Sequence, residues 1–172
     1  YESVDPDRSN DKRQLAQAVN IPAAVFGTCT ETDDDYYAIN VSAGERVSFE
    51  VVGNRLGKAF DPVVDIYRSN GEFLVEHDND AGLFFDCRFE HTFQTAGRYI
   101  VRLRDTRYQG SEHWAYLLRM GRFSVARVAL PSTAKPGEAM LVDFPQGNCG
   151  PRKVSFPTEL TTERFFYGWQ GD

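Results

Sequence analysis

The sequence is short of positive charge, cysteine and long apolar runs. Its 172 residues carry 19 Lys and Arg against 25 Asp and Glu, a net charge of -6. Phosphate backbones are bound by basic surfaces, so nucleic acid is not an expected partner. No apolar run approaches the roughly 18–20 residues that a membrane span requires. No signal peptide is visible. Because the chain opens on Tyr1, we expect a processed or excised piece.

The three cysteines form neither a zinc-binding pattern nor a disulfide framework. Cys29 and Cys87 both fall on apolar phases of predicted strands, where buried free thiols are expected. A Cys29–Cys87 bridge is the alternative in an oxidising compartment, because disulfides persist there. Both interpretations stay open at this point, since a disulfide depends on geometry that spacing does not give.

Catalytic motifs are also missing. His77, His91 and His113 lie far apart, without the spacing of a metal-binding pair. The sequence has no Gly-x-Ser-x-Gly nucleophile elbow and no glycine-rich phosphate loop. A pair of carboxylates suited to glycoside hydrolysis stays open, because their separation is a three-dimensional property. We therefore predict that the chain is not an enzyme.

Alternating apolar and polar residues dominate what is present. In residues 32–51, Tyr37 and Ile39 belong to an alternating run before Ala43-Gly44, and the alternation resumes after this turn. Period-two patterning on both sides of a tight turn predicts an antiparallel hairpin with one buried face. Three acidic residues stand directly before this hairpin.

The same pattern repeats along the chain up to residue 121. Further strands are predicted at residues 25–30, 62–67, 73–75, 85–93, 98–104 and 113–120. Ser69-Asn70-Gly71 predicts a hairpin turn between two of them. About eight short strands with turns between them, and almost no helix, predict an all-β fold. The expected architecture is an antiparallel β-sandwich of jelly-roll type.

Composition separates an N-terminal arm from the predicted sandwich. Residues 1–20 form an acidic arm or linker, and residues 21–121 form the sandwich. Within the arm, residues 11–19 have a weak apolar face that predicts a short helix. Asn10 or Asp11 is its expected N-cap, because a short polar side chain accepts a hydrogen bond from the first turn.

Residues 122–172 form a C-terminal extension of different character. Strands are predicted at residues 125–129 and 139–144. The extension is too short for an Ig-like sandwich of about 100 residues. It is either an incomplete Ig-like segment that begins a further β module, or an arm that docks on a partner chain. The aromatic residues between 165 and 169 mark a candidate partner interface.

Residues 21–120 resemble the bacterial pre-peptidase C-terminal (PPC) domain, a secreted β-sandwich module. The resemblance rests on these pieces in order: Ile21-Pro22, Gly27, Asp33-x-Asp35-Tyr36-Tyr37, Ala43-Gly44-Glu45, Phe60-Asp61-Pro62, Asn70-Gly71, Asp78-Asn79-Asp80, Ala96-Gly97-Arg98-Tyr99 and Tyr116-x-Leu118. The pieces that look most like planctomycete-type copies are Arg55-Leu56-Gly57 and Arg104-Asp105 with Tyr108-x-Gly110. The resemblance implies a non-catalytic appendage at a periplasmic, cell-surface or extracellular location.

The resemblance extends to the collagen-binding domains of clostridial collagenases, which bind calcium between an acidic arm and the first strands. Asn10 and Asp11 look like the Asn-Asp pair of that arm. Asp33 and Asp35 look like the ligands at the strand entrance, and Thr28 stands where a hydroxyl supplies an oxygen. Ca²⁺ takes about six to eight oxygens and tolerates irregular cages. The alternative is a solvated acidic turn.

A second group of oxygen-bearing side chains is a weaker candidate for a metal site. Its members are Asp61, Asp78, Asp80 and Asp86. The segment lacks the later Glu of an EF-hand loop. The alternative is that these aspartates form hydrogen bonds from their side chains to the backbone of turns, which requires no metal.

A ligand-binding surface is predicted around one strand. Arg98, Arg102 and Arg104 share its outward phase, and such a row suits anionic polysaccharide. The alternative is pairing with acidic residues on neighbouring strands. Tyr108 and Trp114 flank a polar loop, where aromatic rings either stack on sugar or peptide or join the core.

These features predict a non-catalytic accessory module of an exported multidomain protein. Calcium would stabilise it, and it would set domain orientation or bind an extracellular ligand. One alternative is a carbohydrate- or matrix-binding module, and another is a structural subunit that docks through residues 122–172. The expected partners are other domains or chains of a larger exported protein, with polysaccharide or extracellular matrix as further candidates.

Overall fold

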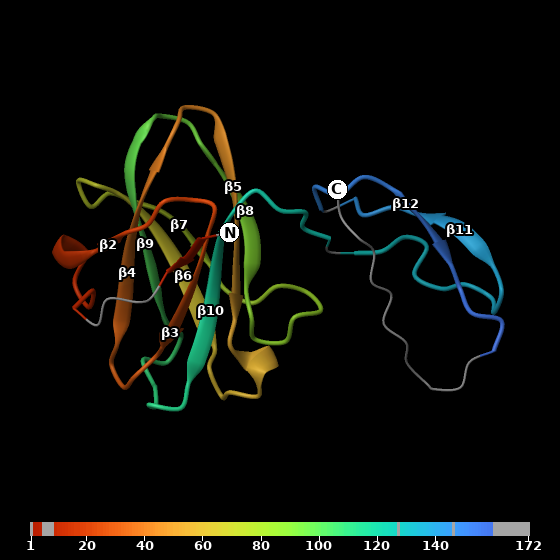
Figure 1. The fold of residues 1–172 in the computed structure, drawn as a ribbon, viewed down its shortest axis with the longest axis horizontal. Coiled ribbons are helices and arrows are strands. Elements are labelled where there is room, and N and C mark those ends of the chain that lie inside the picture. The colour runs from red at the N-terminus through yellow and green to blue at the C-terminus, as the bar shows by residue number, and fades with distance from the viewer. Residues whose placement is uncertain (1, 5–8, 127, 146, 160–172) are drawn as a thin grey trace. The chain divides into compact units, whose positions relative to one another are not determined.

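The computed structural model describes residues 2–4, 9–126, 128–145 and 147–159. The chain divides into two compact units, Tyr1–Phe123 and Ser124–Asp172. Figure 1 draws the first from red to green and the second in blue-green and blue. Within the described ranges, no helix is long and apolar enough to cross a membrane.

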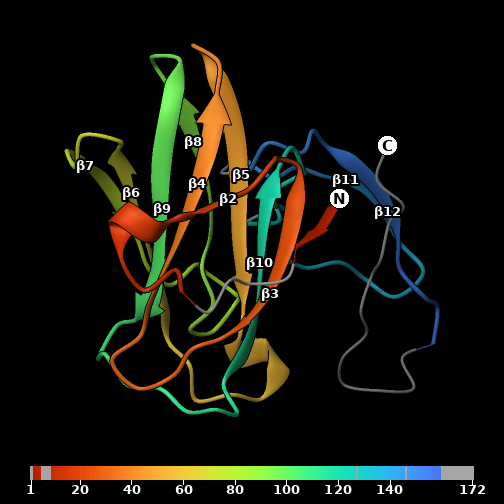
Figure 2. The same cartoon turned by 60° about the vertical axis from the view of Figure 1, so that its left-hand side comes forward.

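The first unit is a β-sandwich of two five-stranded sheets (Figures 1 and 2). The strand order is β1-β3-β10-β5-β8 in one sheet and β2-β4-β9-β6-β7 in the other. All pairs among β3 to β10 are antiparallel. The strands are β1 Glu2–Val4, β2 Gln17–Ala18, β3 Ala23–Thr28, β4 Asp34–Val41, β5 Glu45–Val52, β6 Pro62–Arg68, β7 Phe73–His77, β8 Arg88–Phe93, β9 Gly97–Asp105 and β10 Ala115–Gly121. The predicted all-β sandwich is confirmed.

The core between the two sheets is built from every second residue of each strand, because successive side chains point to opposite faces. Its largest fully buried side chains include Tyr37, Phe49, Phe60, Phe89 and Tyr116. Phe49 and Phe89 stack across the β5–β8 pair with ring centroids 4.8 Å apart. Burial of this apolar surface is the main favourable contribution to folding.

The predicted hairpin around Ala43-Gly44 is wrong. β4 pairs with β2 and β9, whereas β5 pairs with β10 and β8 in the other sheet. The turn therefore carries the chain across the sandwich. Because both strands bury one face in the same core, a hairpin and a crossover show the same alternation. From β3 to β10, only the β6–β7 connection stays within one sheet, which confirms the hairpin predicted at Ser69-Asn70-Gly71.

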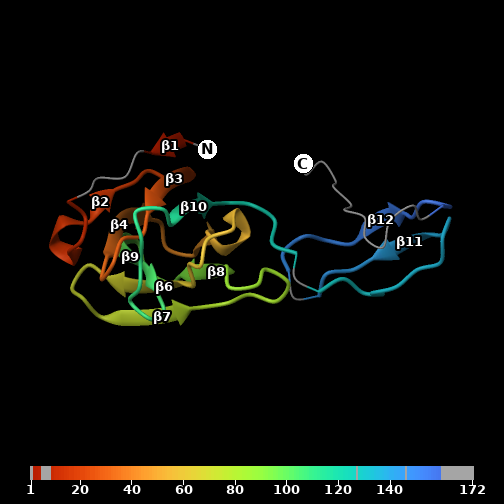
Figure 3. The same cartoon turned by 90° about the horizontal axis from the view of Figure 1, so that it is seen from below.

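The arm does not form the helix predicted for residues 11–19. It forms a 3-10 turn, η1 (Arg13–Leu15), followed by the short strand β2. β2 pairs in parallel with β4, and β1 pairs in parallel with β3, so the arm lies along one side of both sheets (Figure 3). Ala16 packs against Ala38 and Ile100. Pairing with the open edge of β4 outweighs the weak helix propensity of the segment.

The second unit holds two antiparallel strands among its described residues, β11 (Ala139–Val142) and β12 (Arg152–Ser155). Its small core consists of Val142, Phe144, Cys149 and Val154. The strand predicted within 139–144 is present. The strand predicted at 125–129 is wrong, because positions 125, 126, 128 and 129 lie in no strand. The aromatic residues between 165 and 169 lie outside the described residues.

The cysteines are free thiols. Cys29, Cys87 and Cys149 are all buried and unbridged. Cys29 and Cys87 are therefore buried thiols, as the first of the two interpretations predicts, and they do not form a disulfide.

Candidate functional site

The arm meets the sandwich beside the start of β4. Asn10 is 1% exposed, and its carbonyl oxygen accepts a hydrogen bond from the Tyr36 backbone amide at 2.9 Å. Its side-chain amide donates to the Tyr36 carbonyl oxygen at 3.4 Å. Asp33 precedes β4, and Asp35 is the second residue of that strand. We call Asn10, Asp11, Asp33 and Asp35 the arm junction.

Asp35 is the electrostatic centre of the arm junction. The residue is 8% exposed, and its burial raises the pKa of its carboxyl group to about 7. Hydrogen bonds from Tyr116 and Asn10 lower this pKa, while the negative charges of Asp33 and Asp11 raise it. The charges of Asp33 at the strand entrance and Asp11 in the arm therefore both act on the Asp35 carboxyl group.

A chain of buried polar groups ties Asp35 to the core. The Tyr116 hydroxyl donates to Asp35 Oδ2 at 2.7 Å and lies 2.5 Å from the Tyr37 hydroxyl. Both tyrosines are almost completely buried. Gly27 makes room for this arrangement, since a Cβ at that position would overlap the Tyr116 side chain. The carboxylate of Asp35 is therefore held in one position from inside the sandwich.

Four of the five predicted metal ligands belong to the arm junction. Asp33 Oδ2 also accepts hydrogen bonds from Thr30 N and Oγ1 at 3.2 and 3.1 Å, which closes the turn before β4. Thr28 ends β3 with an exposed side chain. Across the ranges that the structure describes, no three His, Cys, Asp or Glu side chains are grouped so as to hold a metal ion. A cation here would also need amide and backbone oxygens, which Ca²⁺ accepts.

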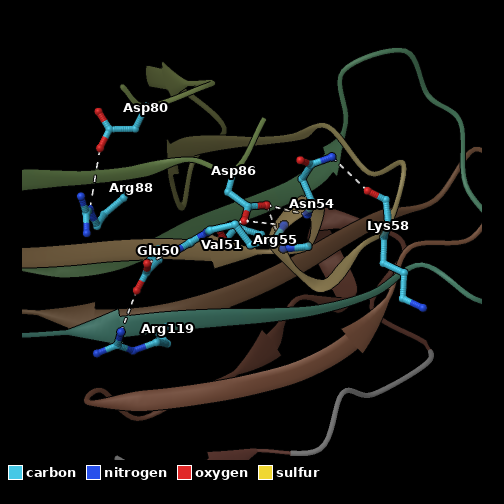
Figure 4. Close-up of polar contacts among 10 residues, drawn as sticks. Glu50, Val51, Asn54, Arg55, Lys58, Asp80, Asp86, Arg88 and Arg119 are labelled. Carbon is cyan, nitrogen blue, oxygen red and sulfur yellow. Dashed lines mark hydrogen bonds and ion pairs between the residues drawn. The ribbon is translucent and has the colours of Figure 1, made fainter. Parts of the chain in front are cut away.

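Asp86, from the second acidic group, anchors a loop (Figure 4). Its carboxylate is fully buried and accepts hydrogen bonds from the backbone amides of Gly53, Asn54 and Arg55 at 2.8, 2.7 and 3.1 Å. Arg55 Nε donates to the same carboxylate at 2.6 Å. These four hydrogen bonds fix the loop after β5 to Asp86. Hydrogen bonding therefore accounts for this carboxylate without a metal.

The other members of that group are also engaged. Asp80 forms an ion pair with Arg88 at 3.7 Å (Figure 4). With its amide oriented to suit its neighbours, Asn79 donates to Asp78 and Asp61 Oδ1 at 3.2 Å each. Burial and the charge of Asp78 raise the pKa of Asp61. The contacts match the turn interpretation, and a metal ion in this group stays a prediction.

The predicted arginine row lies on the sheet β2-β4-β9-β6-β7, where two of its members pair with acids. Arg102 donates to Asp34 at 2.7 Å and to Asp65 at 3.2 Å. Arg104 pairs with Asp65 at 3.5 Å and with Glu76 at 2.9 Å. Burial raises the pKa of Asp65 even though both guanidinium groups lower it. Arg102 and Arg104 therefore pair with acidic residues on neighbouring strands, which is the alternative that the sequence analysis gives for this row.

Tyrosine rings lie beside these guanidinium groups. Tyr108 is 49% exposed, and Arg102 and Arg104 lie 5.8 and 5.1 Å from the centre of its ring. Arg102 also lies 6.0 Å from the centre of the Tyr36 ring. Cation–π contacts of this kind contribute roughly 0.5–1 kcal/mol each at exposed sites. They bring together three of the five residues predicted to bind a ligand.

The other two residues predicted to bind a ligand lie elsewhere. Arg98 donates to the Ala16 carbonyl oxygen of the arm at 3.5 Å. Trp114 is partly buried and packs on the core, with its ring centroid 6.2 Å from that of Phe60. The sequence leaves open whether Trp114 stacks on a ligand or joins the core. The structure shows it packed on the core.

Two polar networks are not predicted by the sequence. One is the buried Tyr37–Tyr116 hydroxyl pair described above. In the other, Glu50 Oε1 accepts from Arg55 at 2.9 Å and Glu50 Oε2 from Arg119 at 2.6 Å (Figure 4). Glu50 stands inside a largely apolar strand, and an acidic residue in that position is a usable sequence signal for a buried ion-pair network. Tyr37 and Tyr116 give no such signal, because an aromatic ring is expected in the core whether or not its hydroxyl group has a partner.

Comparison with known proteins places the chain in no family. No family model matches the sequence, and no curated protein matches it. Among solved structures, it is similar to the pre-peptidase C-terminal domain of collagenase from Bacillus anthracis, with 12% identity over 61% of this chain and 93% of that chain and a TM-score of 0.47. It is also similar to Aeromonas hydrophila PliG, a periplasmic lysozyme inhibitor of g-type lysozyme, with 14% identity over 69% and 98% and a TM-score of 0.46. Likeness at these TM-scores establishes neither family nor function.

Proposed function

We propose that this chain is a non-catalytic accessory module of an exported multidomain protein, and that calcium fastens its arm to the sandwich. The observation that carries the proposal is the burial of the Asp35 carboxylate where Asn10 of the arm bonds to Tyr36 of β4, with the charges of Asp33 and Asp11 raising the pKa of Asp35. A divalent cation among these groups would turn their repulsion into attraction and offset the cost of burying an ionised carboxylate. Asn10 would add an amide oxygen, and Thr28 a hydroxyl.

The position of the arm junction suits a role in domain orientation. Asn10 and Asp11 belong to the arm, while Asp33 and Asp35 belong to the sandwich, so a single ion would join the two. In a longer protein, a fixed arm would set the direction from which a preceding domain enters. The exported location and the domain partners are proposed on the resemblance of residues 21–120 to PPC domains.

The surroundings of several reactive side chains support a non-catalytic role. Burial raises the pKa of the Cys29 thiol to about 12, which keeps it protonated and unreactive at neutral pH. His91 lies edge-on to Phe93 with ring centroids 4.7 Å apart, and burial lowers its pKa. His77 stacks on Phe89 at 3.7 Å. Packing accounts for each of these side chains.

Calcium is expected to raise the thermal midpoint of unfolding. A ligand that binds only the folded chain stabilises it by about 2.7 kcal/mol at a concentration 100 times its Kd. Melts of the full chain in millimolar Ca²⁺ and in EDTA measure the shift. Asp11→Asn should reduce it, whereas Glu112→Gln, which changes an exposed carboxylate outside the arm junction, should leave it unchanged. An unshifted midpoint at millimolar Ca²⁺ would sink the proposal.

A second candidate function is polysaccharide binding on the sheet β2-β4-β9-β6-β7. The observation that favours it is the half-exposed Tyr108 ring with the guanidinium groups of Arg102 and Arg104 held against it. Ion pairs to Asp34 and Asp65 fix those groups, so less conformational freedom would be lost on binding. An aromatic face beside guanidinium donors suits the faces and hydroxyl groups of sugars.

Electrophoresis in gels that contain a soluble polysaccharide tests this surface. Neutral xylan and anionic pectin are suitable probes. We expect one of them to retard the chain and Tyr108→Ala to restore most of its mobility. Phe26→Ala is the matched control, because Phe26 is 57% exposed on the other sheet. Equal retardation of the two variants would count against Tyr108.

A further inference from the structure

One end of the sandwich carries four loops that we call the loop end. They are residues 29–33, 53–61, 78–87 and 106–114. Figure 1 shows residues 29–33, 53–61 and 106–114 at the lower end of the first unit and residues 78–87 beside its lower half, and Figure 2 gives a second view. Hydrogen bonds join them, from Thr106 N to the Asp61 carbonyl at 2.8 Å and from Ser111 N to the Cys29 carbonyl at 2.9 Å. The loop end is therefore one connected surface.

Exposed apolar side chains collect in the loop end. In the described part of the first unit, the large hydrophobic residues that are exposed are Leu15, Phe26, Leu56, Phe73, Phe84, Phe85 and Tyr108. Four of these seven, Leu56, Phe84, Phe85 and Tyr108, lie in its loops. Phe84 is 78% exposed and Phe85 is 51% exposed. Neighbouring exposed aromatic residues such as Phe84 and Phe85 are candidates for an interaction surface.

Backbone strain occurs at the same end. Among the described residues, the non-glycine residues with positive φ are Thr32, Phe84 and Tyr108, at 59°, 60° and 55°. All three lie in the loop end. An L-residue seldom adopts this conformation, and bulky residues do so least often. Such strain concentrates at functional sites, where it fixes a side chain in a required position.

The loop that carries the two phenylalanines is held firmly. Leu83 N donates to the Asp80 carbonyl at 3.0 Å, Asp86 N to the Leu83 carbonyl at 3.1 Å, and Asp80 N to the Asp86 carbonyl at 3.1 Å. Leu83 is 9% exposed and fills the inward position of the loop, while Asp86 ties it to the loop after β5. Phe84 and Phe85 are thus displayed on a preorganised support, which lowers the entropy lost on binding.

The loop end is acidic. Its carboxylate residues are Glu31, Asp33, Asp61, Asp78, Asp80, Asp86 and Glu112, and its basic residues are Arg55, Lys58 and Arg107. Asp80 and Asp86 are buried and form ion pairs with Arg88 and Arg55. The remaining five carboxylates against three basic side chains leave a net charge of -2 (3 − 5) on the accessible surface. Complementarity of charge favours a positively charged partner and disfavours anionic lipid.

We propose that the loop end is a docking surface for a second protein, one with an apolar pocket surrounded by basic residues, and that Phe84 and Phe85 enter this pocket. Rigid aromatic side chains surrounded by polar groups contribute much of the binding energy of protein interfaces. The acidic loops steer the basic partner towards them. This inference extends the proposed accessory role by naming the surface and the kind of partner, and it does not depend on calcium.

A phage-displayed library of random dodecapeptides, panned against the immobilised full chain, provides the probe. We expect the enriched peptides to combine apolar residues with Arg or Lys. Binding of a synthetic enriched peptide, followed by fluorescence anisotropy, should weaken at least about tenfold in the double variant Phe84→Ser/Phe85→Ser. Phe26→Ser is the matched control and should keep the affinity of the wild type. Circular dichroism checks that both variants are folded.

Three outcomes of the peptide experiment overturn the inference. They are a failure to enrich any peptide, the enrichment of acidic peptides, and equal binding of the peptide to the wild type and the double variant. Binding to phosphatidylcholine vesicles or to neutral xylan that is lost in the double variant would assign the loop end to lipid or sugar, and likewise overturns it. The calcium-dependent shift of the midpoint should be the same in the double variant and the wild type, so the two proposals fail separately.

Discussion

Asp86→Asn is expected to lower the free energy of unfolding by roughly 3–5 kcal/mol, because it leaves several buried donors without a charged acceptor. The Asp86 carboxylate is fully buried and accepts hydrogen bonds from three backbone amides and from Arg55 Nε. An amide in its place removes the charge opposite Arg55 and turns an NH₂ group towards donors. Urea unfolding at neutral pH, followed by circular dichroism, measures the loss.

A surface carboxylate gives the control for this prediction. Glu31→Gln changes an exposed side chain at the same end of the sandwich and should alter the free energy of unfolding by no more than about 0.5 kcal/mol. The loss in Asp86→Asn should be the same with EDTA present, because hydrogen bonds explain it. If the loss caused by Asp86→Asn disappeared in EDTA, Asp86 would be a metal ligand and the anchoring role would be wrong.

Asp35 is expected to make the chain less stable as the pH rises. Its pKa is about 7 in the folded chain against an ordinary value of 3.8. Between these values the folded chain holds a proton that the unfolded chain has lost. The stability contributed by that proton is complete below about pH 4 and is lost as the pH rises through about 7. Without divalent cations, the loss is on the order of 4 kcal/mol.

The matched variant for this prediction is Asp35→Asn. Its neutral amide can still accept the hydrogen bond from Tyr116, but it does not ionise. In EDTA at pH 8, we expect this variant to be more stable than the wild type. Near pH 4 the two should be about equally stable, because Asp35 is then protonated in the folded chain. Parallel pH profiles of the two proteins from pH 4 to 8 would contradict the raised pKa.

Alternation in the sequence predicts the strands of the sandwich but not their partners. Tyr37 and Ile39 belong to the alternating run that predicts one buried face, and both lie in the core, because burial of one face imposes a period of two. Sheet assignment failed at the turn around Ala43-Gly44, since a crossover leaves the same pattern as a hairpin. The arm failed for another reason: pairing with β4 is a tertiary interaction that local propensity does not report.

The candidate site shows the same limit. The sequence predicts that the Asn-Asp pair of the arm meets the two aspartates at the entrance to β4, and Asp11 and Asp33 both act on the pKa of Asp35. The sequence did not reveal that Asp86 is an anchor, because an aspartate in a turn looks the same whether it binds backbone amides or a cation. The loop end depends on positive φ at Phe84 and Tyr108, which alternation cannot indicate.

The central claim, calcium at the arm junction, is tested most directly by calorimetric titration of Ca²⁺ into the EDTA-treated full chain near pH 7.5. We predict saturable binding of a single ion at the arm junction. Because Asp35 is partly protonated at this pH, binding should release protons, so the measured heat should depend on the ionisation enthalpy of the buffer. Asp35→Asn should abolish this binding and Glu112→Gln should keep it. The absence of saturable heat in the wild type, or the same isotherm for the wild type and Asp35→Asn, would contradict the claim.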